Sequence, residues 1–130
     1  MDIGQRALDY HKNGYNCAQS VFAACCEYTG LDEKTALALS AGFGGGARSG
    51  ELCGVVTGAI MAEGLVFPFN DGQDTEAKDK IAAIAKQCVN IAREKYGYVR
   101  CADLKGNIDC SEIIAFMAKT AEDIMKKEKN

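Results

Sequence analysis

Apolar residues recur at spacings of three and four along most of the chain, which is the periodicity of helices that bury one face. The clearest stripe consists of Ala77, Ile81, Ile84, Cys88 and Ile91. Runs of β-branched residues are few, and the chain holds a single proline, Pro68. This pattern predicts an all-α protein.

Capping residues and glycines divide the pattern into separate helices. Asn16 and Asp109 have the residue types preferred at helix N-caps, and Gly30 and Gly97 those preferred just after helix ends. We expect helices over residues 2–12, 17–29, 32–41, 50–67, 75–96 and from 110 onward, with an irregular segment or single turn at 101–107. The prediction is a compact bundle of five to six helices, with a glycine-rich loop at 42–50 before the central helix.

Length and composition fit one globular unit. The 130 residues are 48% hydrophobic and 25% charged, without a repeat or linker, so we expect a single helical domain over residues 1–130. The net charge of −3 argues against a nucleic-acid partner. We expect no membrane partner, because no apolar run approaches the ~20 residues of a bilayer span. With no signal peptide evident, we expect a cytoplasmic location, where thiols stay reduced.

The glycine-rich segment at 42–50 does not predict a nucleotide site. A phosphate-binding loop needs a lysine after its last glycine, and none stands there. A dinucleotide-binding fingerprint follows a strand, whereas a helix is expected before this segment.

A glycine stripe continues into the central helix. Gly50, Gly54, Gly58 and Ala62 recur at every fourth residue and so share one side of it. An interior glycine costs about 1 kcal/mol relative to alanine, so a close neighbour must offset that cost. Tight contact with another helix is the first interpretation. Room for a bound cluster or ligand, with Gly54 and Gly58 as cofactor-binding residues, is a second and compatible one.

The seven cysteines fall into two groups. Cys25 and Cys88 lie on apolar helix faces, where a thiol packs as a small hydrophobic residue, and Cys26 lies at the edge of such a face. The other four are candidate site residues, namely Cys17, Cys53, Cys101 and Cys110. Three of these stand at expected helix starts, where free N–H groups favour thiolate, and the fourth follows Arg100.

The spacing of these four cysteines matches no local metal motif. Zinc ribbons use paired Cys-x-x-Cys knuckles, and ferredoxin runs are also tightly spaced. Any four-thiolate site must therefore be assembled by the fold. We expect His11, the sole histidine, at the surface rather than as a ligand. Glu63 is expected on an exposed helix face, with a buried carboxylate near the site as the alternative. No acid–base pair or catalytic triad is evident, which leaves open whether the protein is an enzyme.

Three segments together carry a family resemblance. The segments are Asn16-Cys17-Ala18-Gln19-Ser20-Val21, Gly42-Phe43-Gly44-Gly45-Gly46 and Cys53-Gly54-Val55-Val56-Thr57-Gly58, and they are followed by Cys101 and Cys110. Together they resemble the C_GCAxxG_C_C family of small proteins, to which a redox role is assigned by prediction. The resemblance covers nearly the whole chain. It implies that Cys17, Cys53, Cys101 and Cys110 are the family's four cysteines. Val55 departs from the motif, which has alanine at this position.

Three functions compete. The first is electron transfer or redox sensing by an iron–sulfur cluster, most simply [2Fe–2S], for which Cys17, Cys53, Cys101 and Cys110 are the metal ligands and a redox protein is the partner. The second is metal-free thiol–disulfide chemistry, in which Cys53 or Cys110 attacks and Cys101 or Cys17 resolves. The third is a non-redox helical interaction module or homodimer that uses the glycine stripe as a packing seam. The sequence favours the first.

Overall fold

The computed structural model describes residues 1–129, and its regular structure there is helical apart from one isolated antiparallel bridge between Leu52 and Arg100. The all-α prediction is confirmed. The α-helices are α1 (Ile3–Lys12), α2 (Cys17–Ala24), α3 (Cys26–Thr29), α4 (Glu33–Ser40), α5 (Gly54–Val66), α6 (Thr75–Tyr96), α7 (Cys101–Leu104) and α8 (Cys110–Lys129). A short turn of 3-10 helix at Ala41–Phe43 and a wide turn at Gly46–Gly50 separate α4 from α5.

Six of the helices in residues 1–129 have eight or more residues, α3 and α7 are single turns of four, and two boundaries differ from those expected. The expected helix at 17–29 is broken at Cys25, whose N–H bonds to the carbonyl of Phe22 three residues back instead of four. This tighter turn separates α2 from α3. The central helix begins at Gly54 rather than Gly50, because Gly50 has a φ of +75° and belongs to the wide turn. Neither difference changes the helical class.

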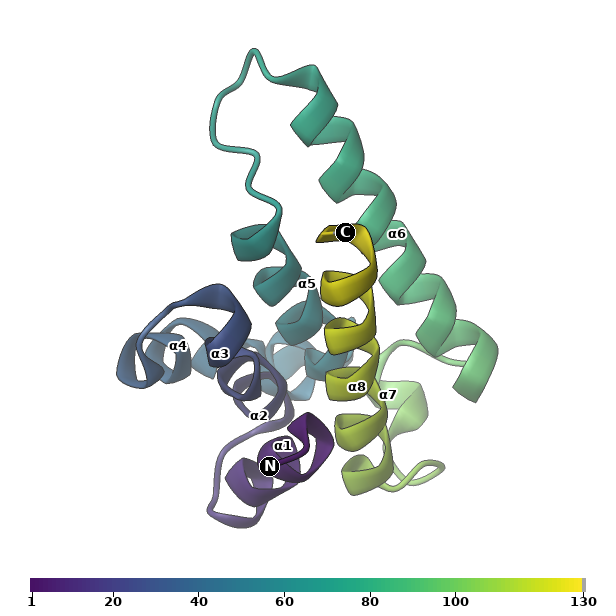
Figure 1. The fold of residues 1–130 in the computed structure, drawn as a ribbon. Helices are drawn as coiled ribbons and strands as arrows, with labels where there is room; N and C mark the ends of the chain where they lie inside the picture. Colours follow the sequence, from purple (N-terminus) through teal and green to yellow (C-terminus); the bar gives the residue numbers. More distant parts are fainter. Residues whose placement is uncertain (130) are drawn as a thin grey trace.

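Helix α5 lies inside the molecule and is covered by α2, α8 and α6 (Figure 1). Helix α1 packs across α2 and α8, so the two ends of the chain contribute to one body. The N-terminal part of α6 extends beyond the end of α8 (Figure 1). None of the helices in residues 1–129 combines the length and apolar character that crossing a bilayer requires.

The contact between α2 and α5 is too close for side chains on one face of α5. A Cβ added at Gly54 would lie 2.6 Å from the Sγ atom of Cys17, and one at Gly58 would lie 2.8 Å from the carbonyl oxygen of Ala18. Tight helix contact, the first interpretation of the glycine stripe, therefore holds for these two positions. Because these two residues have no side chain, α2 packs directly against this face of α5.

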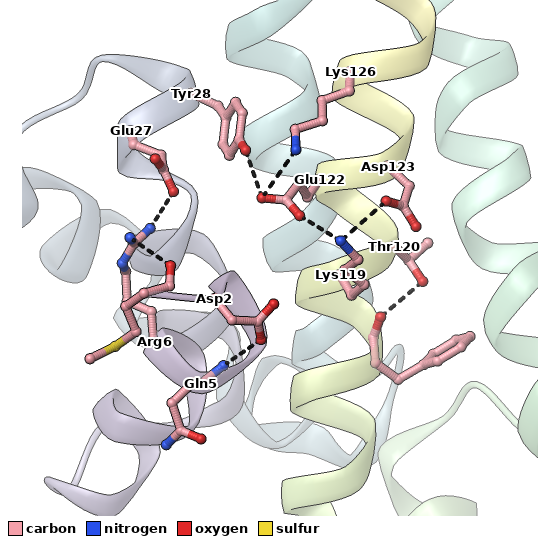
Figure 2. A network of polar contacts seen from close by, with 12 residues as sticks. Asp2, Gln5, Arg6, Glu27, Tyr28, Lys119, Thr120, Glu122, Asp123 and Lys126 are labelled. Carbon is pink, nitrogen blue, oxygen red and sulfur yellow. Dashed lines mark hydrogen bonds and ion pairs between the residues drawn. The ribbon is translucent and has the colours of Figure 1, made fainter.

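Polar contacts join α1 and α3 to their neighbours at the edge of the body (Figure 2). Arg6 of α1 pairs with Glu27 of α3, and the hydroxyl of Tyr28 donates a hydrogen bond of 2.6 Å to Glu122 of α8. The carboxylate of Glu122 also accepts a hydrogen bond of 2.9 Å from Lys119. The hydrogen bond from Tyr28 holds the pKa of Glu122 below its usual range, so this acceptor stays charged.

Glu63 is fully buried, which corrects the expectation that it lies on an exposed face. It is on α5, and neither carboxylate oxygen has a hydrogen-bond partner among the described residues. Burial raises its pKa to about 8, and the neighbouring thiol of Cys88 lowers it by a smaller amount. The side chain is therefore mostly a neutral carboxylic acid at pH 7.

We predict that Gly58→Ala destabilises the protein by about 1–3 kcal/mol, since a Cβ there meets the backbone of α2, which cannot move without shifting the helix. Gly64→Ala is the matched control on the same helix, where a Cβ meets nothing within 4 Å. It should leave stability unchanged or raise it by up to about 1 kcal/mol. Urea unfolding of both variants measures this, and equal stability of the two would contradict the close-contact account.

We predict that Glu63→Gln removes a pH dependence of stability. The contribution of Glu63 to the free energy of unfolding is greatest below its unfolded pKa of about 4.3. It falls by about 1.4 kcal/mol per pH unit above that value. It is lost once the pH passes the folded pKa of about 8. The difference in unfolding free energy between the native protein and this variant, measured from pH 5 to 9, should show the slope. Glu94→Gln, at an exposed site on α6, should not; a slope unchanged by Glu63→Gln would refute the assignment.

Candidate functional site

One cavity of about 230 Å³ is lined by Cys17, Cys53, Cys101 and Cys110, the four cysteines singled out from the sequence. Its other lining residues are His11, Asn16, Gly45, Leu104, Lys105, Ile108 and Ile113. The thiols come from the starts of α2, α5, α7 and α8. The fold thus gathers residues that are up to 93 positions apart, Cys17 and Cys110, around one small space.

The start of α2 is fixed by Asn16, the N-cap residue that the sequence indicates, together with Gln19. Asn16 accepts a hydrogen bond of 2.9 Å from the N–H of Gln19, and the side chain of Gln19 accepts one of 3.0 Å from the N–H of Asn16. This reciprocal capping box defines where the helix begins. The side-chain amide of Asn16 also donates to the carbonyl of Ala41, at 2.9 Å. Cys17 is therefore held as the first residue of α2.

Backbone hydrogen bonds bring Cys101 to Cys53. The N–H of Cys53 donates to the carbonyl of Val99 at 2.8 Å, and the N–H of Cys101 donates to the carbonyl of Glu51 at 2.7 Å. These bonds flank the bridge between Leu52 and Arg100. The segment before α5 is thereby paired with the segment before α7, a long-range pairing that the local sequence pattern does not encode.

Cys17 and Cys53 form a coupled pair. The thiol of Cys53 and the backbone N–H groups of Gly45, Ala18 and Gly54 lie close enough to the sulfur of Cys17 to stabilise negative charge on it. These donors lower the pKa of Cys17 although burial opposes them. The pKa of Cys53 is raised, first by the hydrogen bond that its proton makes to Cys17 and then by burial. Cys17 is thus the thiolate of the pair, and Cys53 keeps the proton.

The remaining two cysteines differ in exposure. Cys101 is half-buried at the start of α7, and Cys110 is exposed at the start of α8. Burial, followed by the proximity of Cys17 and Cys101, raises the pKa of Cys110. The sequence favoured Cys53 or Cys110 as the attacking thiol, whereas the pKa directions favour Cys17.

A left-handed turn holds Gly45 against Cys17. The φ angles of Gly45, Gly46, Ala47 and Arg48 are 64°, 65°, 58° and 61°. Ala47 and Arg48 are the non-glycine residues with positive φ in the described part of the chain, and this conformation costs about 1–2 kcal/mol per residue. The N–H of Glu51 closes the turn on the carbonyl of Gly46, at 3.1 Å. The sequence predicts a glycine-rich loop here but gives no signal for this handedness.

The other cysteines and the glycines of the stripe in α5 lie outside the lining of this cavity. Cys25 and Cys88 are fully buried in the core, as predicted, and Cys26 is half-buried on α3. Gly54 and Gly58 face α2 and do not line the cavity.

His11, expected at the surface, is half-buried and lines the cavity, with its Nδ1 atom 3.3 Å from the carbonyl oxygen of Tyr15. Nothing in the local sequence pattern marks it, because its place depends on how α1 packs.

The donors around the cavity do not surround a single ion. Within residues 1–129, no group of three or more histidine, cysteine, aspartate or glutamate side chains is arranged to hold one metal ion. The chemistry of the donor set is nonetheless that of iron–sulfur sites, because four thiols line one small cavity. The arrangement therefore supports thiolate chemistry directly and offers the ligand types that a cluster would need.

We predict that Cys53→Ala raises the pKa of Cys17 by about one to two units, since a hydrogen bond to a charged group contributes about 1.5–3 kcal/mol. Cys53→Ser keeps a donor and should raise it less. The measurement is the pH dependence of iodoacetamide alkylation at Cys17, followed by peptide mass spectrometry. Cys26→Ser is the control on a thiol outside the cavity, and an unshifted profile in Cys53→Ala would show that the pair is not coupled.

Comparison with known proteins agrees with this site. A family model described as "Putative redox-active protein (C_GCAxxG_C_C)" matches residues 15–124, a range that includes all four cavity cysteines. No curated protein and no solved structure matches the chain. The match spans most of the 130 residues. The chain belongs to the C_GCAxxG_C_C family.

Proposed function

We propose that the protein carries out thiol–disulfide redox chemistry in which Cys17 and Cys53 are the reacting pair. The observation that carries this proposal is that both side chains line the four-cysteine cavity, with the Cys53 thiol close enough to lower the pKa of Cys17. Cys17 is half-buried and so accessible to attack, whereas Cys53 is 6% exposed. An accessible thiolate beside a protonated thiol has the arrangement of an attacking and a resolving cysteine.

The reaction needs a disulfide as oxidant, which a partner molecule supplies. The thiolate of Cys17 attacks one sulfur of that disulfide, the sulfur–sulfur bond breaks, and the first partner thiolate leaves with the electron pair. Cys53 then loses its proton to solvent and attacks the sulfur of Cys17, which expels the second partner thiolate. The products are a Cys17–Cys53 disulfide and two partner thiols, so two electrons pass to the partner. A dithiol partner reverses the sequence.

An iron–sulfur centre is the second candidate, and the observation that favours it is the gathering of four thiols around one cavity. Cys17, Cys53, Cys101 and Cys110 would hold the cluster, most simply [2Fe–2S], which would supply one-electron transfer to a redox partner protein. The N–H groups of Gly45, Ala18 and Gly54 that point to Cys17 stabilise negative charge on its sulfur in either chemistry. A cytoplasmic location, where thiols are kept reduced, suits both candidates.

The glycine stripe gives no support to the non-redox alternative, an interaction module or homodimer. That alternative used the glycine stripe as a seam between copies of the chain, but Gly54 and Gly58 face α2 of the same chain. Gly50 lies outside α5, in the wide turn. The glycines thus stabilise the fold and leave no glycine seam free for a second chain.

Purification without oxygen, with iron and sulfide analysis, separates the candidates. For the thiol route we expect no stoichiometric iron or sulfide, and oxidation by a small disulfide should give one Cys17–Cys53 bond that peptide mapping locates. Cys17→Ser and Cys53→Ser should abolish this bond, whereas Cys26→Ser should keep it.

Bound iron and sulfide with visible absorption, lost on serine substitution of any cavity cysteine, would instead establish the cluster. A protein that holds no metal and whose thiols remain unoxidised would contradict both redox proposals.

A further inference from the structure

A second cavity of about 320 Å³ adjoins the four-cysteine cavity. It is lined by Gly45, Arg48, Gly50, Cys101, Ala102 and Lys105. Three of these residues, Gly45, Cys101 and Lys105, also line the first cavity. The two cavities therefore share one wall that includes Cys101, a candidate redox cysteine, and each has a volume suited to part of a small molecule.

The lining of this second cavity is cationic. It contains Arg48 and Lys105 and no acidic side chain. Neither cation has an ion-pair partner among residues 1–129, because the neighbouring acids Glu51 and Asp103 pair with Arg100, at 3.8 Å and 3.9 Å. Two uncompensated positive charges thus face one cavity in a chain whose net charge is −3. A concave surface of this kind concentrates anions.

The backbone holds Arg48 at this cavity at an energetic cost. Arg48 has a φ of +61°, in the left-handed region that residues other than glycine rarely adopt. The turn that carries it is packed tightly: a Cβ at Gly50 would lie 3.2 Å from the Cβ atom of Ala102 on α7. Arg48 is therefore presented from a strained but well-supported turn, a combination that is concentrated at functional sites.

We propose that the second cavity binds the carboxylate or phosphate group of a small thiol or disulfide whose sulfur enters the four-cysteine cavity. The guanidinium group of Arg48 can bind such an oxyanion through two hydrogen bonds, with Lys105 as a second positive charge. This inference rests on the thiol–disulfide route proposed above and adds the class of substrate: small and anionic rather than neutral.

Two disulfides that differ in charge test the proposal. Dithiobis(nitrobenzoate) carries two carboxylates, whereas dithiodipyridine is neutral at pH 7. The reduced, metal-free protein is mixed with each under single-turnover conditions, and release of the aromatic thiol gives the two rate constants. The readout is the rate constant for the anionic disulfide divided by that for the neutral one. A change in the pKa of the attacking thiol affects both reactions and cancels in this ratio.

We expect Arg48→Gln combined with Lys105→Gln to lower this ratio by about tenfold or more, as expected when charge-assisted hydrogen bonds to an anion are lost. Arg48→Gln alone should lower it by a smaller factor. The matched control is Lys86→Gln combined with Arg93→Gln, which removes the same net charge from exposed positions on α6 and should leave the ratio unchanged.

A ratio that falls equally in the control pair would mean that net charge alone is responsible, and a ratio unchanged in the cavity variants would also overturn the proposal. Failure of the thiol route looks different. In that case the cavity thiols of the unsubstituted protein would react with both disulfides no faster than those of the urea-unfolded chain.

Discussion

The contact between α2 and α5 is the constraint on which the site depends. A Cβ at residue 54 would lie 2.6 Å from the Sγ atom of Cys17 and 3.0 Å from both the backbone N and the Cβ atom of Ala18, so a side chain here would push the two helices apart. Because they meet, the first residue of α2 lies beside Cys53, the N-cap residue of α5. The low pKa of Cys17, to which the neighbouring Cys53 thiol contributes most, follows from this approach.

A mostly apolar cavity makes the charge state of its sulfurs depend strongly on local donors. Low polarity strengthens the attraction between a thiolate and the N–H groups aimed at it, and equally the repulsion between two thiolates. The donors converge on Cys17 and lower its pKa. The pKa of Cys53 is raised by the interaction of its proton with Cys17 and by burial, and that of Cys110 by burial and then by the charge of Cys17. The site therefore favours one thiolate at a time, which is the charge state that thiol–disulfide exchange needs at its first step.

The sequence predicts the features that local patterns encode and misses those that depend on distant contacts. The helical class and the cap at Asn16 follow from periodicity and residue type. The grouping of the cavity cysteines also came from local signals, since most of them stand at helix starts. His11 in the cavity, the burial of Glu63 and the left-handed conformation of Arg48 had no local signal. Each is set by helices or turns that pack from elsewhere in the chain.

The buried ionisable groups outside the cavity show why burial alone cannot create the proposed redox site. Cys25 and Cys88 are fully buried, and burial is the largest cause that raises the pKa of both. Glu63 is also buried, its carboxylate oxygens have no hydrogen-bond partner among residues 1–129, and its pKa rises to about 8. Cys17 is half-buried, yet its pKa falls, because the Cys53 thiol and three backbone N–H groups stabilise its thiolate. Those donors are positioned by two helix starts and one strained turn, so thiolate chemistry is confined to this end of the bundle while the core thiols stay inert.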